Sequence, residues 1–184
     1  MLSFAGSFAL YTFISPILIN ITNLSVAMAS GLLLCYGVGA AVGNIAAGRL
    51  IDQRGMDQIS VLMVSGVSLT LLLSAFFLSS PVAMGLVIGI LGFATYGAIP
   101  PLQSRMLMLA QRYVPDAIDI ASGMNIAAFN TGVAAGSVLG GASARYGGLS
   151  ILPWISAGIS ILALTALFLQ IKSKSMRAIN KKNA

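Results

Sequence analysis

The sequence contains no histidine and no glutamate, and only 8% of its 184 residues are charged. The four acidic residues are all aspartates that lie in the breaks between apolar runs or at their edges, and Cys35 is the only cysteine. Without histidine there are no Ser-His or Cys-His nucleophile pairs and no histidine metal sites. Aspartates confined to breaks leave few candidates for general acid–base catalysis, and one cysteine forms no internal disulfide. We therefore expect no enzyme, no metal site and no cofactor.

Most of the chain is apolar instead. The chain is 58% hydrophobic with a mean hydropathy of +0.95, which is too apolar for a soluble domain of this length. Each of six apolar segments has about 20 residues or more, enough to cross a bilayer core of about 30 Å as a helix. They are Leu2–Ile21, Val26–Ile51, Ile59–Leu78, Val82–Leu102, Ile118–Ala144 and Leu149–Ile171. Because only helices satisfy their own backbone over such lengths in lipid, we predict an all-α membrane protein with six transmembrane helices.

The basic residues indicate how these helices are oriented. A net charge of +6 would suggest nucleic acid in a soluble protein, but here the charges lie at the ends of apolar segments. If the N-terminus is cytoplasmic, Arg145 is the only basic residue outside. The others fall inside: Arg49, Arg54, Arg105, Arg112, Lys172, Lys174, Arg177, Lys181 and Lys182. We predict two cytoplasmic termini, a basic cytoplasmic tail over residues 172–184 that contacts lipid headgroups, and no nucleic-acid partner.

A signal peptide is the alternative interpretation of the first segment. Ala27-Met28-Ala29 has the small residues of a signal-peptidase site, with an apolar region before it. No basic region precedes that segment, however, and Ser7, Thr12 and other polar residues interrupt it. The topology of the remaining helices is the same under either interpretation.

Two features recur in the two halves of the chain. Tyr-x-x-Ile-x-Pro occurs at residues 11–16 and 96–101, in the first helix of each three-helix block. The second helices carry Gly-x-x-x-Gly spacings that let helix backbones approach closely: Gly39 and Gly43 in one, and Gly132, Gly136 and Gly140 in the other. Because each block has three spans, the second block enters the membrane from the opposite side and is inverted relative to the first. We predict a 3+3 inverted repeat with units of about 1–78 and 82–171, kinked at the prolines.

A charged cluster separates the second and third apolar segments. It contains Gly48, Arg49, Asp52, Arg54 and Gly55, and we expect a short cytoplasmic loop in which Gly55 allows a tight turn. One interpretation is that these charges only fix the topology. The other is that they contact a neighbouring helix end and latch one conformational state.

Gly48-Arg-Leu-Ile-Asp-Gln-Arg-Gly55 resembles the G-x-L-x-D-x-x-G motif of the major facilitator superfamily, which joins helices 2 and 3 and recurs between helices 8 and 9. The family usually has basic residues after the last glycine, where this chain has Met56 and Asp57. FAGSFALYTFISPIL and the following SGLLLCYGVGAAVGNIAAGRLIDQRG resemble helices 7 and 8 of its drug:proton antiporter and sugar-efflux members. SGMNIAAFNTGVAAGSVLGG is similar to helix 11, so the resemblance covers nearly all of residues 4–171.

The resemblance implies the C-terminal six-helix half of a twelve-helix efflux permease in the bacterial inner membrane. Such a protein works by alternating access, on a small-molecule substrate and with a second six-helix half. No charged residue lies near the middle of a span, so proton-coupling residues are expected on the other half. The polar residues nearest the implied cavity are Tyr11, Ser15, Tyr96, Gln103 and Asn125, although hydrogen bonding between helices also explains them. A stand-alone homodimer, a non-transporting partner and an inactive fragment remain as alternatives.

Overall fold

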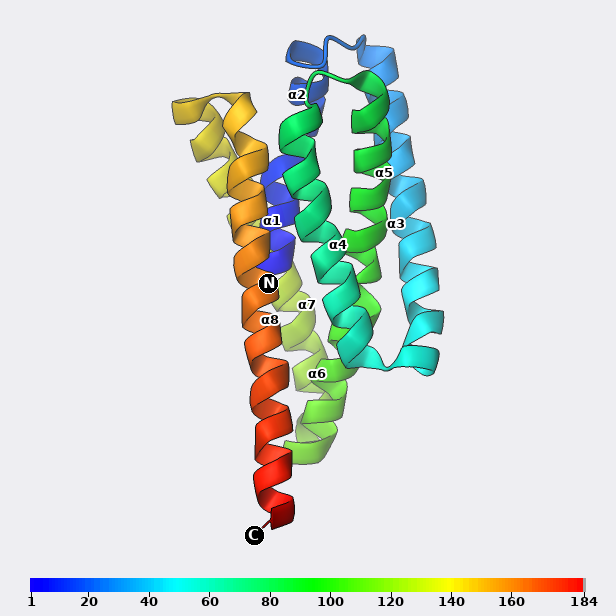
Figure 1. The fold of residues 1–184 in the computed structure, drawn as a ribbon, viewed down its shortest axis with the longest axis vertical. Coiled ribbons are helices and arrows are strands. Elements are labelled where there is room, and N and C mark those ends of the chain that lie inside the picture. The colour runs from blue at the N-terminus through cyan, green and yellow to red at the C-terminus, as the bar shows by residue number, and fades with distance from the viewer. Residues whose placement is uncertain (184) are drawn as a thin grey trace.

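The computed structural model describes the backbone of residues 1–183 and the side chains of residues 1–173. The described residues form helices and no strands (Figure 1). The helices are α1 (Leu2–Tyr11), α2 (Ile14–Asn20), α3 (Val26–Arg54), α4 (Met56–Phe77), α5 (Pro81–Gly97), α6 (Ile99–Tyr113), α7 (Ile118–Gly147) and α8 (Leu152–Asn183), with short 3-10 turns at Pro115–Ala117 and Leu149–Ile151. The predicted all-α membrane fold is confirmed.

Five stretches of the described chain are long and apolar enough to cross a membrane: Leu2–Asn20, Val26–Arg54, Met56–Phe77, Pro81–Tyr113 and Leu149–Ser173. The sixth predicted span is α7, a helix of 30 residues that is not among them. Its sequence is diluted by glycine, serine and asparagine, which lower its hydropathy without shortening the helix. At about 1.5 Å per residue, α7 is still long enough to cross a bilayer core.

The two Tyr-x-x-Ile-x-Pro stretches coincide with helix breaks. α1 ends at Tyr11 and α2 begins at Ile14, two residues before Pro16. α5 ends at Gly97 and α6 begins at Ile99, two residues before Pro101. Proline has no backbone N–H, and its ring collides with the carbonyl group four residues earlier, so the helix breaks just ahead of it. The predicted kinks are therefore confirmed as breaks at equivalent positions of the two repeat units.

The helix pairing follows the predicted inverted repeat. α3, in the first unit, packs most extensively on α5, and α7, its counterpart in the second unit, packs on α1 (Figure 1). α4 of the first unit packs on α5 of the second, and α8 of the second unit packs on α1 of the first. The third helix of each unit therefore contacts the first helix of the other unit. α4 and α8, the third helices of their units, pack on each other. This exchange of equivalent contacts is what an approximate two-fold axis between the units requires.

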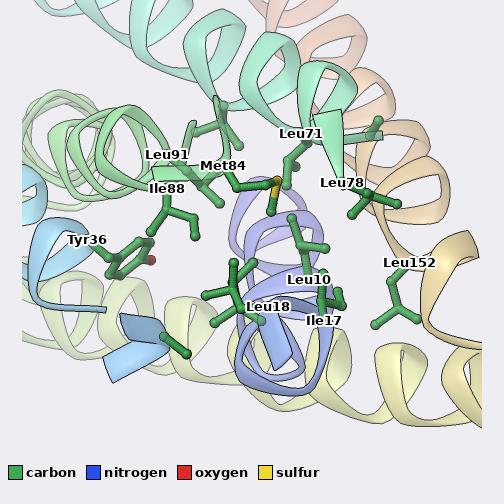
Figure 2. Packing of buried hydrophobic residues seen from close by; sticks show 14 of the residues in the cluster. Leu10, Ile17, Leu18, Tyr36, Leu71, Leu78, Met84, Ile88, Leu91 and Leu152 are labelled. Atoms are coloured by element: carbon green, nitrogen blue, oxygen red, sulfur yellow. The ribbon is translucent and has the colours of Figure 1, made fainter. Parts of the chain in front are cut away.

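The packed interior lies where α1, α2, α4 and α5 meet. Figure 2 shows Leu10, Ile17, Leu71, Met84 and Leu91 from these helices pointing toward one another, and all five are almost fully buried. A second buried cluster lies around Ala47, Ile59 and Leu167. It joins the C-terminal half of α3, the N-terminal half of α4 and the middle of α8. Apolar side chains also cover the outside, as expected for a surface that faces lipid.

The charged turn is shorter than predicted. α3 continues through Arg54, so Arg49, Asp52 and Arg54 lie on the last turns of a helix rather than in a loop. Only Gly55 separates α3 from α4, and its φ of +82° is a left-handed conformation that glycine adopts without strain. The predicted basic tail is the end of α8 as far as Asn183, and its side chains beyond Ser173 lie outside the described residues.

Candidate functional site

Three tyrosines from three helices meet at the level of the helix breaks. The ring of Tyr11 on α1 stacks on Tyr36 of α3, with centroids 4.0 Å apart and an interplanar angle of 23°. Tyr36 in turn meets Tyr96 of α5 edge to face, with centroids 6.1 Å apart. Tyr36 is buried, while Tyr11 and Tyr96 are half-exposed. The structure thus brings together two predicted cavity residues, Tyr11 and Tyr96, through a third that sequence reasoning missed.

The other predicted cavity residues lie apart from this tyrosine cluster. Ser15 is on α2, Gln103 on α6 and Asn125 on α7, and all three are half-buried. The side-chain nitrogen of Asn125 is buried without a hydrogen-bond partner. Within the described part of the chain, no hydrogen bond or ring contact joins these three residues to the tyrosines.

Hydroxyl pairs connect helices that are distant in sequence. Ser7 on α1 and Thr95 on α5 are 3.0 Å apart, and Ser68 on α4 and Ser160 on α8 are 2.9 Å apart. Thr12, in the break after α1, is 2.8 Å from Ser137 on α7. In a membrane such a hydrogen bond contributes about 0.6 kcal/mol. These pairs help to position the helices around the breaks, and no sequence signal identified them.

The predicted packing glycines lie at the closest helix contacts. A Cβ atom added at Gly39 or Gly43 of α3 would collide with backbone carbonyl groups of α5. A Cβ atom at Gly132, Gly136 or Gly140 of α7 would collide with the backbone of α1 or of Met1 just before it. The helices approach this closely because these residues lack a side chain, and van der Waals contact then holds them together.

α3 and α7 each carry a second row of small residues on the side opposite these glycines. On α7 the end of the row still touches the break after α1, where Ser137 bonds to Thr12 and Gly141 lies near the ring of Phe13. On α3 the row is Gly37, Ala41, Asn44 and Gly48, and on α7 it is Asn130, Ala134, Ser137 and Gly141. The two rows have the same spacing and are offset by 93 positions, the same offset that relates Gly39 to Gly132. Asn44 and Asn130 are both exposed. We call these eight residues the open face.

An ion pair joins the first turn of α4 to the middle of α6. Arg105 Nη1 lies 3.2 Å from Asp57 Oδ1, and the whole Arg105 residue is only 8% exposed. Asp57 occupies the first turn of α4, where the helix dipole favours a negative charge. By contrast, Arg49, Asp52 and Arg54 are exposed and form no ion pair with one another in the described structure. Sequence reasoning treated Arg105 only as a topology signal.

Residues 1–184 match the profile described as Major Facilitator Superfamily. The chain belongs to this superfamily. Its relatives include the uncharacterized MFS-type transporter YtbD of Bacillus subtilis, which is 35% identical over 90% of the chain and 41% of its own length. The inner membrane transport protein YdhP of Escherichia coli K12 is 31% identical over 95% of the chain and 44% of its own length. A probable sugar efflux transporter of Helicobacter pylori is 30% identical over 92% of the chain and 42% of its own length.

The chain spans about two fifths of the length of these curated relatives. Six helices arranged as a 3+3 repeat are half of the fold of this superfamily. No group of three or more cysteine, aspartate or other metal-binding side chains lies within the described residues.

Proposed function

We propose that this chain is the C-terminal six-helix half of a major facilitator efflux permease in the bacterial inner membrane, with both termini cytoplasmic. A second six-helix half covers the open face, and a small, uncharged substrate crosses between the halves by alternating access. Proton-coupling carboxylates reside on that second half. In this proposal Tyr11, Ser15, Tyr96, Gln103 and Asn125 line the cavity, and Asp52 acts in a cytoplasmic latch.

The open face is the observation that carries the proposal. An asparagine amide left against hydrocarbon loses its hydrogen bonds to water, at a cost of a few kcal/mol. Asn44 and Asn130 are nevertheless exposed on helices of the membrane bundle, in rows of small residues that suit close helix contact. A second protein half or a water-filled cavity at this face removes the cost. The repetition of the row on α3 and α7 supports one continuous contact with a partner that also has two-fold internal symmetry.

The substrate class follows from the neutral cavity side chains. Tyrosine, serine, glutamine and asparagine hydrogen-bond to hydroxyl groups, and tyrosine rings also pack on the C–H faces of sugar rings. The relative from Helicobacter pylori carries the name of a probable sugar efflux transporter. We therefore propose a neutral, hydroxyl-rich compound such as a sugar as the substrate.

Transport is tested with the full-length protein that contains this segment. Cells that express it are loaded with ¹⁴C-labelled arabinose, glucose or lactose in separate experiments, and efflux is followed after dilution. We expect efflux of at least one sugar to fall several-fold in Tyr96→Ala and Gln103→Ala. The matched control is Thr165→Ala, which changes an exposed hydroxyl on α8 that bonds only to its own helix. Equal efflux in all variants would refute the cavity assignment.

The second half is tested by cross-linking from two positions on α3. A photoreactive benzoylphenylalanine replaces Ala41, in the open face, or Val38, which is exposed in an apolar row with Leu34 and Val42. We expect the probe at position 41 to cross-link to a part of the same full-length polypeptide outside residues 1–184, and the probe at position 38 to give little protein product. A cross-link from position 41 to a second copy of this segment would instead favour the homodimer.

The orientation is tested by labelling single cysteines in intact cells, in a variant in which Cys35 is replaced by serine. Ser150 lies between α7 and α8, and Gln53 lies at the end of α3; both are exposed. A membrane-impermeant maleimide should label Ser150→Cys in intact cells and Gln53→Cys only after the cells are broken. The reverse pattern would contradict cytoplasmic termini.

A further inference from the structure

Arg145 is the one basic residue of the sequence that the proposed orientation leaves outside the membrane. It lies in the last turn of α7, is exposed, and takes part in no salt bridge within the described residues. Its guanidinium carbon lies 5.6 Å from the centre of the Tyr146 ring, and Tyr146 is 84% exposed. A guanidinium group that rests on an aromatic face keeps its N–H groups free to bind an anion.

The same tyrosine forms one wall of a groove between α7 and α8. The groove has a volume of about 380 Å³, within the range of about 300–1,000 Å³ that is usual for ligand sites. It is lined by Ala142, Ser143, Tyr146, Gly147, Ile151 and Ile155. The hydroxyl group of Ser143 donates a hydrogen bond to the carbonyl oxygen of Leu139, so its proton is already paired within α7. The lining therefore suits a hydrocarbon chain.

The groove opens because α7 and α8 both pack on α1 more extensively than on each other. Leu139 on α7 and Gly158 on α8 lie about one turn deeper in the membrane than the groove, and both are exposed. A Cβ atom added at Gly158 would meet nothing within 4 Å. Because residues three and four apart share a side of a helix, exposed surface without charge continues from the groove toward the middle of the bilayer. This is the direction in which an acyl chain runs.

Aromatic side chains indicate the depth of the groove in the membrane. Trp154, next to Ile155 on α8, is exposed and meets Phe76 of α4 edge to face, with ring centroids 5.1 Å apart. The end of α7, the start of α8 and the end of α4 lie at the same end of the molecule (Figure 1). Tryptophan and tyrosine gather where lipid headgroups meet the acyl chains. The groove therefore lies at the level of the headgroups, with Arg145 within their reach.

The groove and the open face lie on different sides of α7. Each residue of a helix turns the chain by about 100°, so Tyr146 is about 140° round the helix from Gly141 and Ala142 is about 140° round it from Ser137. Ser137 and Gly141 belong to the open face, whereas Ala142 and Tyr146 line the groove. A second half that covers the open face therefore leaves the groove in contact with lipid.

We propose that this groove binds an anionic glycerophospholipid of the outer leaflet. One acyl chain lies in the groove between α7 and α8, and Arg145 donates hydrogen bonds to the phosphate group while Tyr146 supports the guanidinium. A zwitterionic lipid with an ammonium headgroup binds less well, because the ammonium group repels Arg145. The choice of leaflet rests on the proposed orientation, but the site itself does not.

The test uses the full-length protein in phosphatidylcholine vesicles that contain a small amount of photoreactive phosphatidylglycerol or phosphatidylethanolamine. Both probes carry the same diazirine in one acyl chain, and lipid adducts on residues 139–158 are quantified by mass spectrometry after illumination. At equal concentration we expect phosphatidylglycerol to label this segment about fivefold more than phosphatidylethanolamine, the ratio expected from one basic residue at a membrane surface. The preference should fall as the salt concentration rises.

Four variants separate the headgroup contact from the groove. Arg145→Gln should bring the ratio of the two labels close to one, and Arg145→Lys should keep part of the preference, because an ammonium group binds phosphate at a single point. Ala142→Phe fills the groove without a change of charge and should lower labelling by both lipids several-fold. The matched control is Leu86→Phe, which adds the same ring at an exposed position of α5 and should leave the labelling unchanged.

Equal labelling by the two lipids in the unchanged protein, or a preference that persists in Arg145→Gln, would overturn the proposal. Unchanged labelling in Ala142→Phe, or a segment 139–158 without lipid adducts, would overturn it as well. The assay needs no substrate, and both leaflets of the vesicles contain the probe, so it does not depend on orientation. The expected labelling in a protein that exports none of the sugars would therefore refute the proposed substrate and support the lipid site.

Discussion

The closest contact between α1 and α7 allows a prediction with a calculable size. In Gly136→Ala the new Cβ atom would collide with the carbonyl oxygen of Ala5, and it would lie 2.8 Å from Ala5 Cα and 2.9 Å from its carbonyl carbon. Carbon atoms in contact are normally about 3.5–4.0 Å apart, so the two helices must separate by roughly 1 Å. Overpacking of this kind costs about 1–3 kcal/mol, and we expect the Tm to fall by roughly 2–10 °C.

The measurement is thermal unfolding of the full-length protein in detergent, followed by fluorescence-detected size exclusion. Gly158→Ala on α8 is the control, because a Cβ atom there meets nothing within 4 Å. It should leave the Tm unchanged or raise it slightly, since alanine favours the helix. Gly43→Ala, the equivalent change on α3, collides with the backbone of Phe93 and should lower the Tm by a similar amount. If the Gly136→Ala and Gly158→Ala variants have the same Tm, α1 and α7 do not pack as closely as the structure shows.

Three further changes test the charged and hydroxyl contacts. Asp52→Asn should reduce efflux without reducing the amount of protein in the membrane, as judged by immunoblot; unchanged efflux would exclude a latch. Arg105→Gln leaves Asp57 without its guanidinium, and because Asp57 keeps some solvent we expect a loss of about 1–3 kcal/mol, partly restored by adding Asp57→Asn. A double variant no more stable than Arg105→Gln would refute the pairing. Ser137→Ala removes the bond to Thr12 and should cost only about 0.6 kcal/mol, so a fall in Tm of many degrees would show that Ser137 does more.

The features that sequence reasoning predicted correctly depend on local chemistry. Length and apolarity identified the helices, because in lipid the backbone has no alternative to the helix. The prolines at positions 16 and 101 marked the breaks, because the missing N–H group of proline removes a helix hydrogen bond within one turn of the residue. The glycine spacings marked the closest helix contacts, since only residues without a Cβ atom allow such an approach.

The features that were missed depend on contacts between distant segments. Tyr36 lies in an apolar run like any other residue of α3, and its place between two breaks follows only from how α1 and α5 pack on it. Arg105 has the sequence pattern of a topology charge, yet it is buried against α4. In a soluble helix the polar face would reveal which side is buried. A membrane helix is apolar on both its lipid-facing and its packed sides, so that signal is absent.

The small residues of α3 and α7 show why these two helices differ from the rest of the bundle. A helix that packs on one neighbour and otherwise faces lipid needs small residues on one side only, and Gly39 and Gly43 already provide that side on α3. The same helix repeats small residues on its other side and adds Asn44, whose amide is costly to place against hydrocarbon. α7 repeats the arrangement with Asn130. Close packing on one side and small polar residues on the other suit a helix that moves against a second surface. In the proposed transporter the internal contacts stay fixed while the open face slides against the second half, and side chains without bulk suit that movement.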